Sequence, residues 1–275
     1  MPAPPPESDP AMVRAICMAG NLHTLLRDLH RRKARERRGL VVAEGRRLVE
    51  DVLAAGAKVT AVLVADDARE HAAAVLETAG RRGVPAETAT RREFDELADT
   101  DTPSGVLAVV EWRPLALAEV RRPAAGPRRA LVIDGVQDPG NVGTMIRTAD
   151  AFGAWLTVAL DGTADVRGPK VVRGSMGALF RHQVAAATFE EWLAYAAREG
   201  VATWVAATRG EPLGARDRAA PDVALVIGNE GQGVRPAWGT HAARSVAVPM
   251  RPGAESLNAA VAAGILLFEL TRADT

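Results

Sequence analysis

The stretch ALVIDGVQDPGNVGTMIRTADAFGA, Ala130 to Ala154, holds the pattern that decides the fold of the C-terminal half. Its first five residues form an apolar run of strand length, followed by a glycine-rich loop and a segment of helix length. Further apolar runs follow at WLTVAL, ATWVAA, VALVIG and RSVAVP, with helix-length segments between them. Continuous apolar runs of this kind are typical of a parallel sheet covered on both faces. The sequence therefore predicts an α/β domain over residues 130–275.

The N-terminal half also alternates between strands and helices. Strands are predicted at LVVAEG, KVTAVLVA, GVPAETA and GVLAVVEW, with helices between them. Before them, leucines at helical spacing from Leu22 to Leu29 predict a helix that runs into a basic cluster. We therefore expect a smaller α/β domain over residues 12–112. A linker rich in proline and arginine would cover residues 113–129, and residues 1–11 would form a disordered tail.

The composition of the 275 residues is that of an ordinary globular protein, with 48% hydrophobic and 25% charged residues. A single cysteine, Cys17, excludes an intramolecular disulfide and a multi-cysteine metal site, and no metal is predicted. The longest apolar stretch, Ala259 to Phe268, is well short of the ~20 residues that cross a bilayer. We expect it to be a buried helix, and the protein to be cytoplasmic with no membrane partner.

The formal net charge is zero, which by itself argues weakly against a nucleic-acid partner. The charge is unevenly distributed, however, because the segment RRKARERR, residues 31–38, carries six cations and one anion. Such a cluster can neutralise several phosphates. A solvated helix face is the alternative explanation of such a charge run. The cations that would contact RNA are Arg31, Arg32, Lys33, Arg35, Arg37 and Arg38.

Three loops follow predicted strands of the C-terminal half, at the edge where open parallel sheets bind ligands. The first loop presents Asn141 between two glycines, and its helix carries Arg147. The second, NEGQG, presents Glu230, and the third places Ser256 and Asn258 before the last helix. Each residue also has a structural explanation, because Asn141 and Ser256 could be helix caps and the charged side chains could be solvated. No G-x-G-x-x-G of a Rossmann methyltransferase is present.

In their joint order and wording, these loops resemble the motifs of the SpoU/TrmH RNA 2′-O-methyltransferases of the SPOUT superfamily. The matching stretches are DPGNVGTMIRTADAFGA, LVIGNEGQGV and VPMRPGAESLNAAVAAGILLFEL, and PKVVRGSMGALF resembles a segment between the first two motifs. The first domain is similar, through AEGRRLVEDVLAAG and TPSGVLAVV, to the family's ribosomal-protein-like substrate-binding domain. The resemblance implies a trefoil knot in a parallel-sheet domain, which is a rare exception among protein folds. It also implies bound S-adenosylmethionine and a homodimer with its active site at the interface.

The resemblance assigns roles residue by residue. The catalytic and RNA-contacting set is Asn141, Arg147, Glu230, Ser256 and Asn258. The cofactor-binding set is Gly228, Asn229, Val248, Met250 and Leu257, and Arg173 is expected to contact RNA. At Gly228 we expect glycine because the backbone approaches the cofactor closely. The last helix, residues 256–272, is apolar nearly all round, so a second subunit would cover part of it.

The reaction implied by the resemblance is attack of a ribose 2′-oxygen on the methyl group of S-adenosylmethionine. Guanidinium stays protonated, so we expect Arg147 to stabilise the developing alkoxide, while a phosphate oxygen, a water or Glu230 takes the proton. Large-subunit ribosomal RNA is the expected substrate, with housekeeping modification and antibiotic self-protection both open. The alternatives are a transfer RNA methyltransferase, a catalytically inactive RNA-binding relative, and an α/β enzyme acting on a small molecule.

Overall fold

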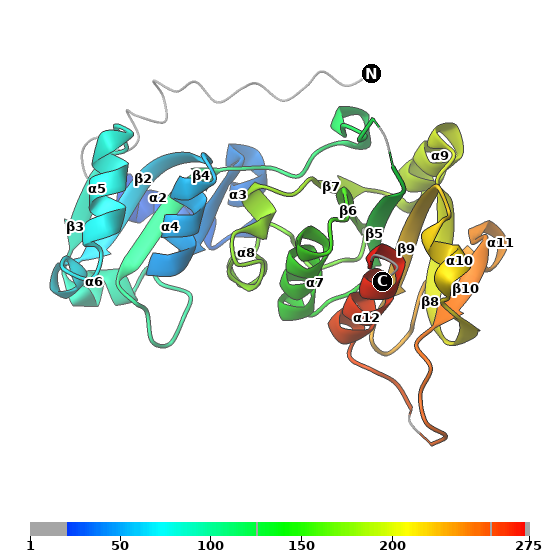
Figure 1. The fold of residues 1–275 in the computed structure, drawn as a ribbon. Helices are drawn as coiled ribbons and strands as arrows, with labels where there is room; N and C mark the ends of the chain where they lie inside the picture. The colour runs from blue at the N-terminus through cyan, green and yellow to red at the C-terminus, as the bar shows by residue number, and fades with distance from the viewer. Residues whose placement is uncertain (1–20, 125, 254, 273–275) are drawn as a thin grey trace. The chain divides into compact units, whose positions relative to one another are not determined.

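The computed structural model describes residues 21–124, 126–253 and 255–272. The predicted disordered tail and Cys17 lie outside these residues. The chain divides into two compact units, each built on one sheet. The first unit contains the chain up to Arg113 together with Arg167–Phe180; the second contains Pro114–Val166 and the residues from Arg181 onward. Figure 1 shows the elements of both units.

The sheet of the first unit is mixed. Its strands are β1 (Leu40–Glu44), β2 (Lys58–Ala65), β3 (Ala86–Ala89) and β4 (Val106–Glu111). Their order is β1-β4-β2-β3, with β4 antiparallel to both of its neighbours and β3 parallel to β2. The strands coincide with the four predicted apolar runs. β2 and β4 lie in the middle of the sheet, and this position explains why their side chains are buried over nearly their whole length.

The helices of the first unit differ from the prediction near the N-terminal basic cluster. The elements are α2 (Asn21–Leu29), α3 (Arg32–Arg38), α4 (Arg46–Ala54), η1 (Asp66–Ala68), α5 (Ala73–Arg81) and α6 (Arg91–Asp95). The single helix predicted from Leu22 into the basic cluster was wrong, because the backbone is extended at Arg31. Arg31 thereby ends one helix and becomes the N-cap of the next. The predicted leucine face of α2 is buried.

A short segment from the C-terminal half of the sequence belongs to the first unit. It contains α8 (Pro169–Gly174) and η3 (Ala178–Phe180), and α8 packs against β1. Val171, Val172 and Leu179 are fully buried there. The expectation of one continuous domain over residues 130–275 did not anticipate this, since the segment lies between two strands of the second sheet.

The sheet of the second unit has six strands, all paired in parallel. The parallel pairing and five of the strands were predicted, whereas the strand at Val184–Ala187 was not. The strands are β5 (Arg128–Asp134), β6 (Leu156–Leu160), β7 (Val184–Ala187), β8 (Ala202–Pro212), β9 (Asp222–Gly228) and β10 (Arg244–Ala247). Their order is β10-β8-β9-β5-β6-β7. The central strands β5 and β9 are buried on both faces, which explains their continuous apolar runs.

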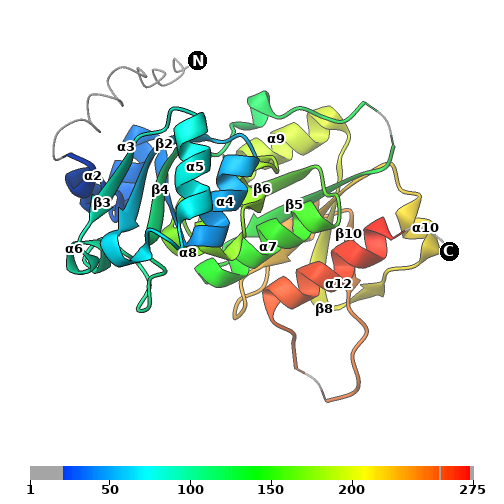
Figure 2. The same ribbon diagram turned by 60° about the vertical axis from the view of Figure 1, so that its left-hand side comes forward.

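Helices cover both faces of this sheet. α7 (Pro139–Ala151) and α12 (Ala259–Thr271) lie side by side against β5 and β9 (Figure 2). Trp192 of α9 (Phe189–Glu199) and Trp238 of α11 (Trp238–His241) pack into the core on Val132 and Val226. The remaining helical elements are η2 (Leu117–Glu119) and α10 (Ala215–Arg218).

The predicted linker is partly structured. Leu115 forms a parallel bridge with Ala185 beside β7, and Leu117 and Val120 pack against the core of the second unit. Arg122 and Arg128 both pair with the buried Asp222 on β9. The apolar residues and these ion pairs attach the segment to the sheet. Within the described ranges, no helix has the length and apolar character needed to cross a membrane.

Candidate active site

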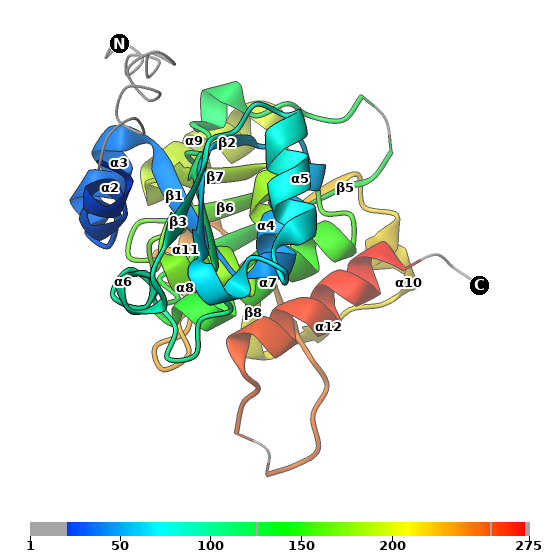
Figure 3. The same ribbon diagram turned by 90° about the vertical axis from the view of Figure 1, so that its left-hand side faces the viewer.

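The loops after β5, β9 and β10 meet at the carboxyl edge of the six-stranded sheet. β5 and β9 are neighbours, and only β8 separates β9 from β10. The loop after β5 leads directly into α7, and α12, which lies beside α7 (Figure 3), is the next element after β10. All the catalytic and cofactor residues expected from the sequence come from these three loops, the last residue of β9 and the helices α7 and α12.

Side chains from the three loops form one hydrogen-bonded chain. Asn141 Nδ2 donates to Glu230 Oε1 at 2.7 Å, and Asn258 Nδ2 donates to Asn141 Oδ1 at 3.0 Å. The orientation of both amides follows from the backbone, because Asn258 Oδ1 accepts from the amides of Ala260 and Val261. Asn258 must therefore present its donor to Asn141, which leaves the Asn141 donor for the carboxylate. The structure thus brings three of the five expected catalytic residues together.

The helix caps differ from those considered from the sequence. Asp138, not Asn141, caps α7, and its carboxylate accepts from the Asn141 amide at 2.7 Å. Asn258, not Ser256, caps α12. The Asn141 side chain therefore does not cap a helix and bonds only to Glu230 and Asn258 in the contacts found among the described residues. Asn258 both caps its helix and takes part in the hydrogen-bonded chain.

The other expected residues lie apart from this chain of contacts. Arg147 is exposed on α7, six residues beyond Asn141, which places it about 120° around the helix. Ser256 and Leu257 are exposed on the loop before α12, and Val248 and Met250 are half-buried at its start. None of the contacts found among the described residues joins Arg147 or Ser256 to Glu230.

The turn after β9 is held by its own residues. Asn229 Oδ1 accepts from the amides of Gly231 and Gln232, and Asn229 Nδ2 donates to Gly135 O at 3.0 Å. A Cβ at Gly228 would lie 2.3 Å from the carbonyl carbon of Gly233. Close packing within the turn therefore requires glycine at Gly228, independently of the ligand approach expected from the sequence. The Asn229 side chain is likewise occupied in shaping the turn.

The strand β8 next to this edge has an irregularity that the sequence analysis missed. β10 pairs with Trp204 and Val205 of β8, and the register then jumps to Glu211 and Pro212. Residues 206–210 therefore leave the regular ladder between the ends of β9 and β10. Gly210 packs on the β10 backbone, where a Cβ would lie 2.8 Å from Val246 C. The only sequence signal was the glycine after an apolar run.

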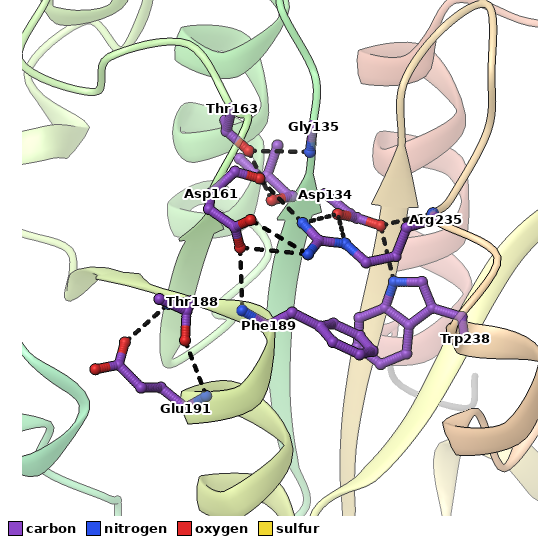
Figure 4. A network of polar contacts seen from close by, with 10 residues as sticks. Asp134, Gly135, Asp161, Thr163, Thr188, Phe189, Glu191, Arg235 and Trp238 are labelled. Carbon is purple, nitrogen blue, oxygen red and sulfur yellow. Dashed lines mark hydrogen bonds and ion pairs between the residues drawn. The ribbon is translucent and has the colours of Figure 1, made fainter.

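A buried ionic network fixes the same edge (Figure 4). Asp134, 3% exposed at the end of β5, accepts from the Arg235 amide at 2.9 Å and from the Trp238 indole at 2.8 Å. Arg235 Nε donates to Asp134 Oδ1 at 2.7 Å, and its Nη1 reaches Asp161 Oδ1 at 3.3 Å. Burial alone would lower the pKa of Arg235, but both carboxylates together raise it. The network joins the loops after β5, β6 and β9.

Comparison with known proteins agrees with this architecture. Residues 128–268 match the model of the SpoU rRNA Methylase family. The chain belongs to the SpoU rRNA methylase family. Residues 25–108 match the MRM3-like substrate binding domain. As in the relatives described next, the activity is S-adenosylmethionine-dependent 2′-O-methylation of RNA ribose.

The relatives match most of this SpoU family chain. The 23S rRNA (guanosine(2553)-2′-O)-methyltransferase RlmP of Bacillus subtilis is 35% identical, over 88% of this chain and 92% of its own. The 23S rRNA (guanosine-2′-O-)-methyltransferase RlmB of Pseudomonas putida is 34% identical, over 72% and 82%. The AdoMet complex of the SpoU methyltransferase AviRb from Streptomyces viridochromogenes has a TM-score of 0.77 and 28% identity, covering 90% and 96%.

The residues at the sheet edge of this SpoU family protein fit S-adenosylmethionine. An adenosyl group has apolar ring faces and polar edges, so its site needs both kinds of surface. Leu257, a large apolar side chain, is 39% exposed beside Asn258, and Val248 and Met250 lie on the same loop. The cofactor, when bound, supplies an electrophilic methyl group.

The RNA-contacting residues expected in the first unit divide into two groups. Arg35 is a correction: it is 5% exposed, and its Nη1 donates to Leu29 O and His30 O at 2.8 Å. It therefore fastens α3 to the end of α2. Arg173 contacts Asp99 at 3.4 Å and Glu44 at 3.8 Å, so two carboxylates already neutralise it. The other cluster cations, Arg31, Arg32, Lys33, Arg37 and Arg38, are exposed or half-buried.

Proposed function

We propose that this enzyme methylates the 2′-oxygen of a guanosine in 23S ribosomal RNA. RlmP, whose name gives that reaction, aligns with 88% of the chain. The observation that carries the proposal is the chain of Asn141, Glu230 and Asn258 at the edge where the family motifs meet. An inactive relative would not need three side chains from distant parts of the sequence to be held together by hydrogen bonds. The first unit would hold the RNA, and the reaction would take place in the cytoplasm, with the ribosomal RNA.

Glu230 is proposed to orient the target hydroxyl. A neutral hydroxyl is a weak nucleophile, so the site has to orient it and share its proton. Glu230 Oε1 is held by Asn141, and in the contacts found for the described residues Oε2 has no partner. Oε2 can therefore accept from the 2′-hydroxyl. The proton then passes to Glu230, to a water or to a phosphate oxygen.

A second copy of the chain is proposed to complete the site. Val261, Ile265 and Phe268 form an exposed stripe on α12, with exposed fractions of 50%, 38% and 46%. Their spacing of four and three residues puts them on one helix face. Burial of this stripe against the same stripe of another copy would give a symmetric dimer.

Arg147 is proposed to act in the site of the partner. Arg147 immediately precedes Thr148. The methyl carbon of Thr148 lies 3.5 Å from the position that a Cβ added to Gly264 of α12 would occupy. Arg147 thus borders the apolar stripe and points away from Asn141 in its own chain. In a dimer it would approach the alkoxide that develops in the other subunit, where a fixed cation stabilises the transition state.

The loops after β9 and β10 are proposed to form the trefoil knot of the family and to hold the adenosyl group. The tight Gly228–Gly233 turn and the exposed Leu257 support this, since one loop is rigid and the other offers apolar surface. Val248 and Met250 would line the same cavity. Gly228 and Asn229 would contribute backbone groups, because the Asn229 side chain is already bonded within its turn.

The proposed function is tested with the full chain, labelled S-adenosylmethionine and unmodified 23S ribosomal RNA transcripts. We expect methyl transfer to one guanosine, detected as a nucleotide whose 3′ phosphodiester resists alkali. The Asn141→Ala variant is the control for transfer by a contaminant. Transfer to total transfer RNA but not to the 23S transcript would reject the proposed substrate, and no transfer to either would support the inactive relative.

A further inference from the structure

One carboxylate of the first unit joins α3 to the segment before α8. Arg32 Nε and Arg167 Nη1 both contact Glu36 Oε1, at 2.9 and 3.5 Å. Arg32 comes from the basic cluster, whereas Arg167 lies 135 residues further along, in the segment inserted between β6 and β7. The shared carboxylate places the inserted segment against α3 within the first unit.

Cations outnumber their acidic partners along the rest of α3. Asp28 Oδ2 contacts both Arg38 at 3.0 Å and Arg37 at 3.5 Å, and the Arg37 side chain is 70% exposed. Arg31 and Lys33 are exposed and make no ion pair with any residue that the structure describes. α3 therefore presents several cations to solvent with few anions between them.

Lys170 continues this charge on α8. It is exposed in the first turn of the helix, three residues after Arg167, so its Cα lies within about 11 Å of the Arg167 Cα. Across the described part of the chain, Lys170 has no ion-pair partner. Nothing in the sequence motifs singled it out.

We propose that Lys170 and the exposed cations of α3 form one RNA phosphate-binding surface, shared between the N-terminal cluster and the inserted segment. The inference rests on the proposed function for the identity of the polyanion. It deepens that function by naming the side chains that bind the RNA phosphates. The cations on this surface are Arg31, Arg32, Lys33, Arg37 and Lys170, and Arg167 links the two segments through Glu36. Arg35 and Arg173 do not belong to it, because internal acceptors occupy their guanidinium groups.

The chemistry of the surface selects backbone phosphates over bases. Neither α3, RKARERR, nor α8, PKVVRG, carries an aromatic side chain on which a base could stack. Flexible lysine and arginine side chains neutralise phosphates without regard to sequence. The surface therefore contributes affinity and orientation, and the choice of nucleotide must come from other parts of the enzyme.

The lysine content of the chain allows a direct test. The sequence has three lysines, Lys33, Lys58 and Lys170, and Lys58 pairs with Glu111 on β4 at 2.7 Å. The wild-type chain is acetylated with a water-soluble reagent, with and without an excess of 23S ribosomal RNA transcript, and analysed by mass spectrometry. We expect RNA to slow acetylation of Lys33 and Lys170 by at least fivefold and to leave Lys58 unchanged.

Variants give an independent measurement. Lys33→Gln and Lys170→Gln should each lower the slope of log affinity against log salt by about 0.7–0.9, and the double variant by about twice that. Lys58→Gln is the matched control and should keep the wild-type slope. Methyl transfer at saturating RNA should be unchanged in Lys58→Gln, because Lys58 lies outside the proposed surface and pairs with Glu111.

Protection of Lys33 without Lys170, or an unchanged slope in Lys170→Gln, would overturn the shared surface while leaving the methyltransferase assignment intact. Equal protection of all three lysines would also overturn it, since the RNA would then cover the unit without preference. If RNA protects Lys33 and Lys170 of the wild-type chain as expected but the chain transfers no methyl group to that RNA, the result would instead count against the proposed function. The two proposals therefore fail in different ways.

Discussion

Asn258 Nδ2 donates a 3.0 Å hydrogen bond to Asn141 Oδ1, although 117 residues separate the two in the chain. The bond links the first turns of α7 and α12, the two helices that pack together on one face of the sheet. It also fixes the direction in which Asn141 offers its own donor to Glu230. The position of the carboxylate thus depends on a helix cap at the other end of the domain sequence.

Replacing Asn258 with serine should separate the two tasks of this residue. Serine is also a good N-cap, so the Asn258→Ser variant should lose less than about 1 kcal/mol of unfolding free energy. Its short side chain cannot reach Asn141, so kcat should fall by about 10²-fold through loss of preorganisation. Urea unfolding and single-turnover methyl transfer measure the two effects. Asn258→Ala should show both losses, and a Ser variant with normal kcat would contradict the role of the bond.

A charge placed on the α12 stripe should disrupt assembly. Val261→Glu should shift the protein from dimer to monomer in analytical ultracentrifugation, because a carboxylate at a buried interface is costly to desolvate. Val261→Ala, which removes apolar area without adding charge, is the matched control and should remain dimeric. An active Val261→Glu monomer would show that one chain suffices.

Mixed dimers test the placement of Arg147 in the partner's site. Arg147→Ala and Glu230→Ala chains should each be inactive alone. Co-expressed, they should form some dimers with one intact composite site and recover about a quarter of wild-type activity, from half of the dimers with one of two sites. Recovery should be absent if Arg147 serves its own chain.

Asp134→Asn should destabilise the protein by about 3 kcal/mol. The substitution leaves the partly buried Arg235 with an amide in place of its carboxylate partner, and removing one member of such a pair costs more than the pair contributes. Trp238→Phe is the milder comparison, since it loses one hydrogen bond worth about 1 kcal/mol and keeps the ring packing on Phe189. Equal unfolding free energies for wild type and Asp134→Asn would show that the ionic network does not stabilise the fold.

His182 should make stability depend on pH in the acid range. Burial lowers its pKa from 6.5 to about 4, with Asp150 opposing and Arg181 adding to the shift, and Thr157 Oγ1 lies 2.8 Å from His182 Nε2. The folded state therefore favours the neutral ring. Its contribution is complete above pH 6.5 and is lost as the pH falls towards 4, by up to about 3 kcal/mol.

The comparison of wild type with His182→Gln isolates this effect from carboxylates that titrate in the same range. The difference in unfolding free energy between the two proteins should change between pH 7 and pH 4.5, with wild type losing more. A constant difference across that range would show that the ring is solvated when the protein is folded.

The sequence predicted the sheet of the second unit because buried parallel strands must be apolar on both faces, and this requirement is local. It also placed Asn141, Glu230 and Asn258 together, since strand ends in a parallel sheet share an edge. It could not distinguish Arg35 from the other cations of RRKARERR. Which of these becomes buried depends on where α2 stops and how α3 lies on β1, and both are set by tertiary packing. The register jump in β8 was invisible for the same reason, because β10 decides it.

The placement of α8 has a consequence for exchanging substrate recognition between SpoU relatives. Residues 167–180 are encoded within the methyltransferase half but complete the first unit, where Val171, Val172 and Leu179 are fully buried. A chimera joined once, near residue 130, would give the new recognition module a foreign α8 and leave a mismatched apolar surface on its β1. Two further junctions, one on each side of residues 167–180, would exchange this segment together with the first unit. The apolar surfaces of α8 and β1 should then match again. The first unit of this enzyme is thus encoded by two separate pieces of the gene.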